Sequence, residues 1–324
     1  MLHQYDVSGW KAIPLFKSES RGSYVKLRVS HPEDPYPRLF CIKRAYYESD
    51  EDELLVFEHI FDSPVEGKTY QKTLLMKRQG IRDIYLEKGY DPSGDSFVLL
   101  VKLSGAYMKI EYQAHEGKVV RRKYYRREEE REQHLMSVNE VVWIGLGELL
   151  QCWNVETNEL RQVSVSTRRE KMRYYITKNL IIMHRDRQLA GSVTLIFLSK
   201  EVEVVQRITI DELLSHEVKS AAENGELALV LLDRELITIN TTTWAHSKQF
   251  LSLTLESFDT SFLLLSEHFN ILLGETENGL TLVRWSPTRE YASHHASLNK
   301  ERLYEVSKTR DSLSLLELSR TTPN

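Results

Sequence analysis

The stretch that decides the fold is Val141–Ser166, VVWIGLGELLQCWNVETNELRQVSVS. It is rich in β-branched and aromatic side chains, which pack well on a pleated sheet, and Gly145 and Gly147 allow the chain to turn between two such segments. The polar run Glu156–Glu159 favours a second turn, after which apolar and polar residues alternate as in a half-buried strand. The stretch predicts three antiparallel strands, which cannot bury two faces alone and need stacked neighbours.

Weaker copies of this pattern recur along the chain. Each copy has an apolar residue that ends a strand just before a polar turn, and we use this residue as the anchor of the repeat. Successive anchors are separated by 41, 44, 42 and 46 residues, close to the roughly 40–45 residues of a four-stranded propeller blade. A looser copy ends at Phe61. The five anchors are Tyr112, Trp153, Phe197, Ile239 and Trp285.

The strand end at Trp153-Asn154, followed by Val-Glu-Thr-Asn-Glu, resembles the WD-repeat β-propeller family, which usually has Trp-Asp at this point. The other anchors lack the dipeptide, and no copy begins with the family's Gly-His pair. The resemblance therefore covers most of the chain in rhythm and residues 141–166 in motif. It implies an all-β fold, with residues 1–324 forming a single β-propeller of six or seven blades, of which seven is favoured.

Closure of the ring is expected to involve the N-terminal segment, residues 1–37. Residues 303–318 supply two strands, too few for a four-stranded blade, and Tyr24–Val29 alternates cleanly without a partner before the proline-rich residues 31–37. We expect Tyr24–Val29 to pair with the C-terminal strands, because a closed ring leaves no exposed gap between blades. The best helix candidate is Asp211–Ser220, which Asp211 could cap.

Composition fits an intracellular globular protein. Of its 324 residues 41% are hydrophobic and 28% are charged, which is ordinary for such a protein, and the net charge of −4 argues against a globally basic nucleic-acid binder. No apolar run approaches the ~18 residues of a membrane span, and the N-terminus has no apolar signal core. We expect a cytoplasmic or nuclear location, no membrane association, and free buried thiols at Cys41 and Cys152.

Sequence motifs for catalysis are missing. The chain has no Gly-x-Ser-x-Gly, phosphate-binding glycine loop, Cys-x-x-Cys or His-Glu-x-x-His. Gly94-Asp95-Ser96 is similar to the start of a Gly-Asp-Ser esterase motif, but here it precedes a strand and no Asp-x-x-His occurs, so a polar turn explains it. We therefore predict no enzyme activity, no catalytic residue, no cofactor and no metal site.

Charged runs are the features that point to partners. Arg121–Glu132 reads RRKYYRREEERE, and a related run lies at Arg168–Tyr175. Both are interpreted either as solvated loops between blades or as one anion- or acidic-peptide-binding patch with tyrosine contacts. The acidic cluster Glu48–Glu53 is interpreted as a solvated hairpin loop or as a docking site for a basic partner. The candidate partner-binding residues are Arg121, Arg122, Tyr124, Arg126, Arg127, Arg168, Arg169, Lys171 and Arg173.

Two functions of different classes follow. The first is a non-enzymatic scaffold or adaptor that binds protein partners, including an acidic peptide, on its propeller faces. The resemblance also implies a possible role as an F-box-type substrate receptor of a ubiquitin ligase. Residues 1–40 carry no F-box-like helical segment, so that role would need an additional N-terminal piece or a divergent adaptor. The alternative is nucleic-acid or anion binding through residues 121–131 and 168–173, which would be steeply salt-dependent.

Overall fold

The structure is a computed structural model, and every element in the part of the chain that it describes is a β-strand. The prediction of an all-β fold is confirmed. The described residues contain no helix long and apolar enough to cross a membrane. They are residues 2–6, 11–16, 23–30, 38–44, 51–59, 70–88, 95–125, 132–145, 149–165, 171–185, 191–214, 217–223, 225–251, 257–258, 264–265, 270–276, 279–285, 295–298, 302–308 and 313–319.

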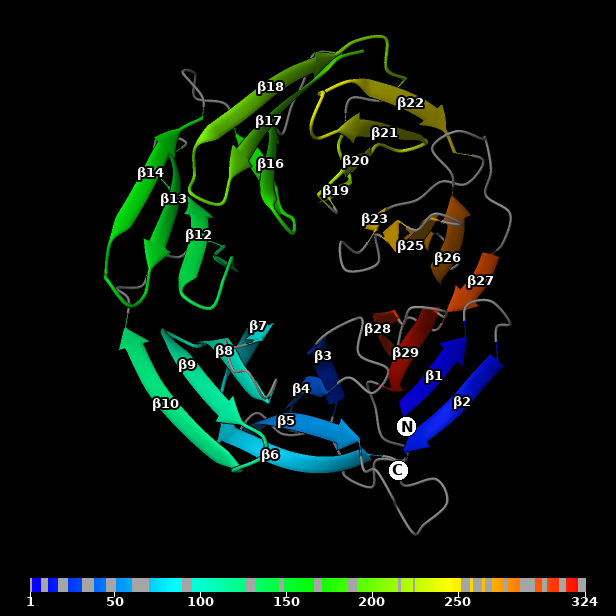
Figure 1. Cartoon of the computed structure of the whole chain (residues 1–324). Helices are drawn as coiled ribbons and strands as arrows, with labels where there is room; N and C mark the ends of the chain where they lie inside the picture. The colour runs from blue at the N-terminus through cyan, green and yellow to red at the C-terminus, as the bar shows by residue number, and fades with distance from the viewer. Residues whose placement is uncertain are drawn as a thin grey trace. The chain divides into compact units, whose positions relative to one another are not determined.

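Five sheets are built from four strands that follow one another along the chain (Figure 1). Each is a meander, in which a strand pairs with the next one in sequence, as expected of a propeller blade. Their strands are β3 (Ser23–Val29), β4 (Leu39–Arg44), β5 (Asp52–His59) and β6 (Tyr70–Arg78); β7 (Ile81–Lys88), β8 (Ser96–Leu103), β9 (Ala106–Gln113) and β10 (Lys118–Tyr125); β11 (His134–Leu135), β12 (Glu140–Ile144), β13 (Leu149–Asn154) and β14 (Leu160–Ser164); β15 (Met172–Ile176), β16 (Leu180–Arg185), β17 (Val193–Ser199) and β18 (Val204–Ile210); and β19 (Ser220–Glu223), β20 (Leu227–Leu231), β21 (Glu235–Asn240) and β22 (His246–Phe250).

Two further sheets involve the C-terminal part of the chain. One has the order β23-β25-β26-β27, with β24 also paired to β25, and the other has the order β2-β1-β29-β28. The number of blades and the closure of a ring stay predictions. The strands are β23 (Ser257–Phe258), β24 (Leu264–Leu265), β25 (Asn270–Thr276), β26 (Gly279–Trp285) and β27 (His295–Leu298), and then β1 (Leu2–Asp6), β2 (Lys11–Phe16), β28 (Arg302–Lys308) and β29 (Leu313–Ser319).

Contacts within the chain divide it into two compact units. The first comprises Met1–Val141, Trp153–Glu159 and Glu301–Asn324, and the second comprises Val142–Cys152 and Leu160–Lys300. Each unit is described by itself below. The expectation of a single domain over residues 1–324 stays a prediction.

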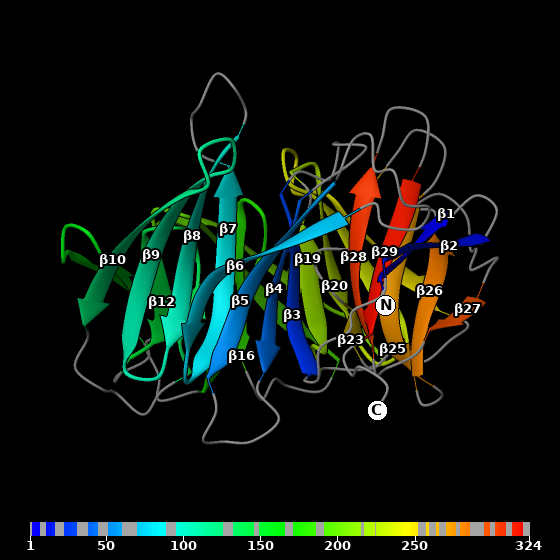
Figure 2. The same ribbon diagram turned by 90° about the horizontal axis from the view of Figure 1, so that it is seen from below.

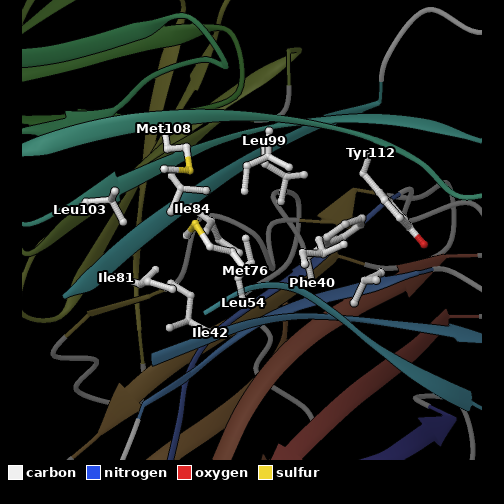
Figure 3. Close-up of a cluster of buried hydrophobic side chains, with 14 of the residues drawn as sticks. Phe40, Ile42, Leu54, Met76, Ile81, Ile84, Leu99, Leu103, Met108 and Tyr112 are labelled. Carbon is white, nitrogen blue, oxygen red and sulfur yellow. The ribbon is translucent and has the colours of Figure 1, made fainter. Parts of the chain in front are cut away.

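The core of the first unit lies between the sheets β3–β6 and β7–β10 (Figure 3). Phe40 of β4 meets Phe97 of β8 with ring centroids 5.5 Å apart. Leu54, Leu99 and Ile110, from the middle strands β5, β8 and β9, are fully buried in the same cluster. Because close-packed interiors respond to the loss of even one methylene, this cluster fixes the spacing between the two sheets.

The core of the second unit joins the sheets β15–β18 and β19–β22. Ile182, Leu195, Val230 and Ile237 are fully buried in one cluster. Strands β16, β17, β20 and β21 are the middle strands of their sheets, and they supply these side chains. Apolar residues of consecutive sheets are therefore packed together in both units, as the three-strand prediction required.

The anchor residues found in the sequence occupy one structural position. Each lies on the third strand of its sheet: Tyr112 on β9, Trp153 on β13, Phe197 on β17, Ile239 on β21 and Trp285 on β26. The spacing of 41–46 residues is therefore the distance along the chain between the third strands of successive sheets. The looser anchor, Phe61, lies outside the described residues.

The turn after Trp153 shows how Asn154 can stand where WD repeats usually have aspartate. The Oδ1 atom of Asn154 accepts hydrogen bonds from the backbone N–H groups of Glu156 and Thr157, both at 3.0 Å. The chain then closes through Asn158, whose φ is 59°, a left-handed conformation that asparagine tolerates. An amide oxygen is thus sufficient for this turn, which is an Asx turn.

The same turn recurs after β21. Asn240 Oδ1 accepts hydrogen bonds from the N–H groups of Thr242 at 3.0 Å and Thr243 at 2.7 Å, and the left-handed residue is Trp244, with φ 60°. In the turn after β9, Gly117 takes this place with φ 59°. Trp244 carries a bulky side chain in a conformation that bulky residues rarely adopt, and its ring packs on Phe197 with centroids 5.0 Å apart.

The predicted partner of the C-terminal strands was wrong. Tyr24–Val29 lies in β3, which pairs antiparallel with β4 as the first strand of its own sheet. The strand that pairs with β29 is β1, with Leu2 opposite Leu318 and Asp6 opposite Ser314. Alternation in Tyr24–Val29 identified a strand correctly, but alternation does not identify its partner. Strands β1 and β2, which precede Tyr24, were not expected from the sequence.

The predicted helix at Asp211–Ser220 was also wrong in its described residues. Glu212 has φ 57°, outside the right-handed helical region. The N–H of Leu213 donates to the Gly191 carbonyl at 3.0 Å, and that of Leu214 donates to the Glu235 carboxylate at 2.9 Å. These distant acceptors hold the segment as a bent connection between β18 and β19, so a capping residue alone did not decide its structure.

Trp153 provides the test of the repeat alignment. Its side chain is buried, as predicted, its Nε1 donates to Asn158 Oδ1 at 3.1 Å, and its ring meets Tyr107 edge-on at 5.6 Å. Trp153→Ala should lower the free energy of unfolding in urea by about 3–5 kcal/mol. The control Leu160→Ala, at a side chain with 51% exposure, should change it by about 0.5 kcal/mol or less. A loss below about 1 kcal/mol for Trp153→Ala would contradict the alignment.

A candidate protein-interaction surface on strand β10

Strand β10 carries the first three of the predicted binding residues, Arg121, Arg122 and Tyr124. It is the fourth strand of its sheet and pairs along its whole length with β9. Figure 2 shows it at the end of the row β7, β8, β9, β10. Every side chain of β10 is exposed or half-buried, because the free side of a last strand has no neighbour within its sheet. Successive side chains alternate between its two faces.

Arg121 is anchored within the fold. Its Nη2 atom donates to the backbone carbonyl of Leu75 in β6. Arg122, on the other face, is 3.9 Å from Glu111, and its side chain is 59% exposed. An exposed ion pair at this distance contributes little to stability. A partner that binds Arg122 therefore disrupts only a weak ion pair, whereas binding Arg121 would disrupt its hydrogen bond to β6.

Glu156 connects β10 to the turn after Trp153. Lys109 of β9 donates from Nζ to Glu156 Oε1 at 2.9 Å and to Asn139 Oδ1 at 2.9 Å. The hydroxyl of Tyr124 donates to Glu156 Oε1 at 3.4 Å. The hydrogen bond from Lys109 is the main cause that lowers the pKa of Glu156, while burial and then the charge of Glu156 raise the pKa of Tyr124. Tyr124 is thus positioned on the strand by a neighbouring carboxylate.

Tyr125 is the most exposed aromatic side chain of the strand, at 71%. The Lys123 ammonium lies over its ring, 4.4 Å from the centroid, and the hydrogen bond and charge of Lys123 lower the pKa of the Tyr125 phenol. A cation and an aromatic ring held together in this way offer a partner both charge and apolar area. This tyrosine was noted in the sequence as a contact but was not among the candidate site residues.

The second basic run is described in part. Lys171 and Arg173 are exposed, and Arg173 lies in β15, the first strand of its sheet. Both belong to the second unit, whereas β10 belongs to the first. Arg126, Arg127, Arg168 and Arg169 lie outside the described residues. That the two runs form one surface stays a prediction.

Asp95, from the Gly94-Asp95-Ser96 triplet, has a structural role. Arg38 donates from Nη2 to Asp95 Oδ1 at 2.6 Å and from Nε to Glu58 Oε1 at 2.7 Å, and Tyr112 donates from its hydroxyl to Glu58 Oε2 at 3.0 Å. Burial and the adjacent Glu58 raise the pKa of Tyr112. Burial lowers the pKa of Arg38, but its bonds to Glu58 and Asp95 outweigh that effect and raise it. The network ties β4 and β5 to β8 and β9.

The acidic cluster at residues 48–53 also has a structural member. Asp52 is buried, and its Oδ2 accepts the backbone N–H of Ile81 at 2.9 Å. Ile81 begins β7, so this carboxylate fixes the start of the next sheet. Both interpretations of the cluster as a surface feature were therefore wrong for Asp52. Among the described residues no group of three or more histidine, cysteine, aspartate or glutamate side chains could hold a metal ion.

The Arg38 network should be a measurable source of stability. Arg38→Met leaves two half-buried carboxylates side by side, so it should lower the free energy of unfolding by about 2 kcal/mol. The control Lys26→Met removes the more exposed pair with Asp83, 3.1 Å long, and should cost at most about 1 kcal/mol. Urea titration measures both. Equal, small losses would show that the network contributes no more than a surface ion pair.

The Glu156–Lys109 contact should affect how the free energy of unfolding changes with pH in the acidic range. Because the folded state lowers the pKa of Glu156, its contribution is present above the unfolded pKa of about 4.3 and is lost as the pH falls through the folded value. The urea midpoint should therefore fall less steeply below about pH 5 in Glu156→Gln than in the natural chain. Lys109→Met should flatten the profile similarly, and the double variant should add nothing. A profile that stays unchanged in Glu156→Gln would contradict this assignment.

Comparison with known proteins places the fold but no family. No protein-family model matches the sequence, and no curated protein matches it. Solved structures are similar over most of the chain at low identity. The WD40 domain of Pan2 from Neurospora crassa shares 8% identity at a TM-score of 0.49, covering 94% of this chain and 90% of that chain. A structure of the mitotic checkpoint complex shares 9% at 0.47, covering 94% and 91%.

The third structure is the uncharacterized protein lmo1340 from Listeria monocytogenes EGD-e, with 12% identity and a TM-score of 0.50, covering 88% of this chain and 86% of that chain. At such identities a likeness concerns the fold alone. The argument for the fold therefore comes from the chain itself: consecutive four-stranded meanders, third strands spaced by 41–46 residues, and the Trp153-Asn154 turn. In fold, this chain is a degenerate WD-repeat-like β-propeller.

Proposed function

We propose that this chain is a non-enzymatic interaction scaffold or adaptor whose strand β10 contacts an acidic segment of a protein partner. The observation that carries the proposal is the composition of β10. Its eight residues, KVVRRKYY, hold Lys118, Arg121, Arg122 and Lys123 and no acidic residue, and all of them are exposed or half-buried. Electrostatic complementarity steers an acidic partner to such a surface and discriminates against basic ones.

Supporting observations concern the rigidity of this surface. The strand is paired to β9 along its length, and Tyr124 is held by Glu156. A recognition surface on a paired strand loses less conformational entropy on binding than one on a loop. Two acidic residues noted in the sequence also have structural partners: Asp95 of the esterase-like triplet binds Arg38, and Asp52 binds the Ile81 amide.

Two further parts of the proposal concern a role in a ubiquitin ligase and the location in the cell. A role as an F-box-type substrate receptor of a ubiquitin ligase rests on the WD-repeat resemblance alone. A cytoplasmic or nuclear location is supported by Cys41 and Cys152, which are both buried and not joined in a disulfide, as in proteins of reducing compartments. Binding to nucleic acid or another anion is the second candidate, supported by the exposed Arg122 and by Lys123 over the ring of Tyr125, because cationic side chains with stacking aromatics also suit single strands.

The test begins with partners identified by cross-linking in the native cell. Arg122→Ser, Arg126→Ser and Arg127→Ser are combined, with Arg121 left in place because it binds the Leu75 carbonyl. Binding of the purified partner should weaken at least tenfold at low salt, with an unchanged melting temperature, since surface substitutions cost little stability. The control Arg207→Ser, on the exposed side of β18, should bind as the natural chain does.

Two results would contradict the proposal. One is partner binding by the triple variant that equals that of the natural chain at low salt. The other is that the cross-linked partner is lost on nuclease treatment and proves to be a nucleic acid. Its binding constant should then fall with rising salt, with a slope of log affinity against log salt near −0.9 for each phosphate neutralised. That second result would establish the nucleic-acid alternative instead.

A further inference from the structure

The fourth strand of each sheet carries an edge that pairs with nothing in its own sheet, and most of these edges are protected. Natural proteins protect edges with short strands, register shifts and proline. Strands β14 and β22 have five residues and β27 has four. The pairings of β6 and β18 contain register shifts, and β2 contains both a shift and Pro14.

Strand β10 lacks these protections. It has eight residues, contains neither proline nor glycine, and pairs with β9 from Lys118 to Tyr125 without a register shift. Of the fourth strands in the described sheets, it is the only one longer than five residues that is regular throughout. Alternate residues of a regular last strand direct their backbone N–H and C=O groups away from the sheet, where another strand can pair with them.

Charge restricts which strand can pair there. Two copies of β10 placed edge to edge would bring four positive side chains of one chain against four of the other, and like charges that lie opposite each other are destabilising. Charged residues are themselves a protection against self-pairing. The same four charges attract a strand that carries carboxylates. The edge of β10 is therefore closed to a second copy of this chain and open to an acidic segment.

Side-chain positions fit such a segment. Arg122 and Tyr124 lie on one face of the strand and Lys123 and Tyr125 on the other, because successive side chains alternate. Cross-strand neighbours lie about 4.5–5.5 Å apart between Cβ atoms, so a glutamate on the added strand reaches Arg122 or Lys123 directly. The exposed ring of Tyr125 offers apolar area to a β-branched residue next to that glutamate.

We propose that the free edge of β10 receives an extended, acidic segment of a protein partner as an additional antiparallel or parallel strand. Main-chain hydrogen bonds hold the segment, and Arg122 and Lys123 select its charge, which is the division of labour in β-strand addition. The inference rests on the proposed function and specifies how the partner is bound. It predicts that both backbone and charge are needed for binding.

The experiment uses the full chain and two fluorescent peptides of alternating Glu and Val, eight residues long. One is unmodified, and the other is N-methylated at four consecutive residues, which keeps the charge and removes main-chain donors on both edges. Fluorescence anisotropy gives the dissociation constants. The unmodified peptide should bind at least tenfold more tightly than the N-methylated one. In amide hydrogen exchange, it should slow the exchange of residues 118–125.

Charge is tested by Arg122→Glu combined with Lys123→Glu, which should weaken binding of the unmodified peptide at least tenfold. The matched control is Arg207→Glu on β18, an exposed arginine of another fourth strand, which should stay within twofold of the natural chain. Melting temperatures confirm that each variant is folded. Sedimentation velocity should show that the natural chain, without peptide, forms no dimer through this edge. A dimer that disappears in the charge-reversal variant would show that two copies pair there.

Strand addition is overturned if the two peptides bind equally, if neither binds, or if the charge reversal leaves binding unchanged. It is also overturned if the edge proves to pair two copies of this chain. These results are separate from the test of the proposed function. Loss of the natural partner in the Arg122, Arg126 and Arg127 variant, together with equal binding of both peptides, would keep the scaffold function and reject the added strand.

Discussion

The constraint on which this structure depends is that its middle strands are apolar on both faces. Residues 39–42 of β4 are apolar and buried, as are residues 228–231 of β20 and residues 236, 237 and 239 of β21. A lone four-stranded sheet would leave both of these faces in water, so each sheet needs a neighbour on either side. Within the first unit this requirement brings Phe40 against Phe97. The polar groups at strand ends, such as Arg38 and Asp52, then fix how neighbouring sheets are aligned.

The sequence predicted what is local and repeated. β-branched residues, alternation and the spacing of the anchors identified the third strands, and Trp153 was correctly expected to be buried. The Arg38 network escaped prediction because its partners Glu58 and Asp95 are 20 and 57 residues away. Asp52 was misread for the same reason: its neighbours Glu51 and Glu53 are acidic too, and its acceptor role depends on Ile81, 29 residues further on. Local patterns cannot show contacts between sheets.

For the candidate site, too, the sequence predicted local properties but not contacts with distant residues. Charge and residue type indicated correctly that Arg121, Arg122, Lys171 and Arg173 are exposed. They did not reveal that Arg121 is bound to β6, nor that Glu156, 47 residues from Lys109, organises Tyr124. The regularity of β10 and the irregularity of the other fourth strands are properties of pairing, and pairing cannot be read from one strand. Fold-level likeness added nothing here, because function lies in particular side chains.

The sheet that contains β1 and β29 has a consequence for the life of the protein on the ribosome. Asp6 and Ser314 are opposite each other in that sheet, and Ser314 lies 308 positions after Asp6 in the chain. At about 5–20 residues per second, β1 waits roughly 15–60 s for its partner. During that interval β1 can pair with β2 on one side, but its other side lacks β29. Biogenesis of this protein therefore includes a window in which a chaperone can act on the exposed side of β1.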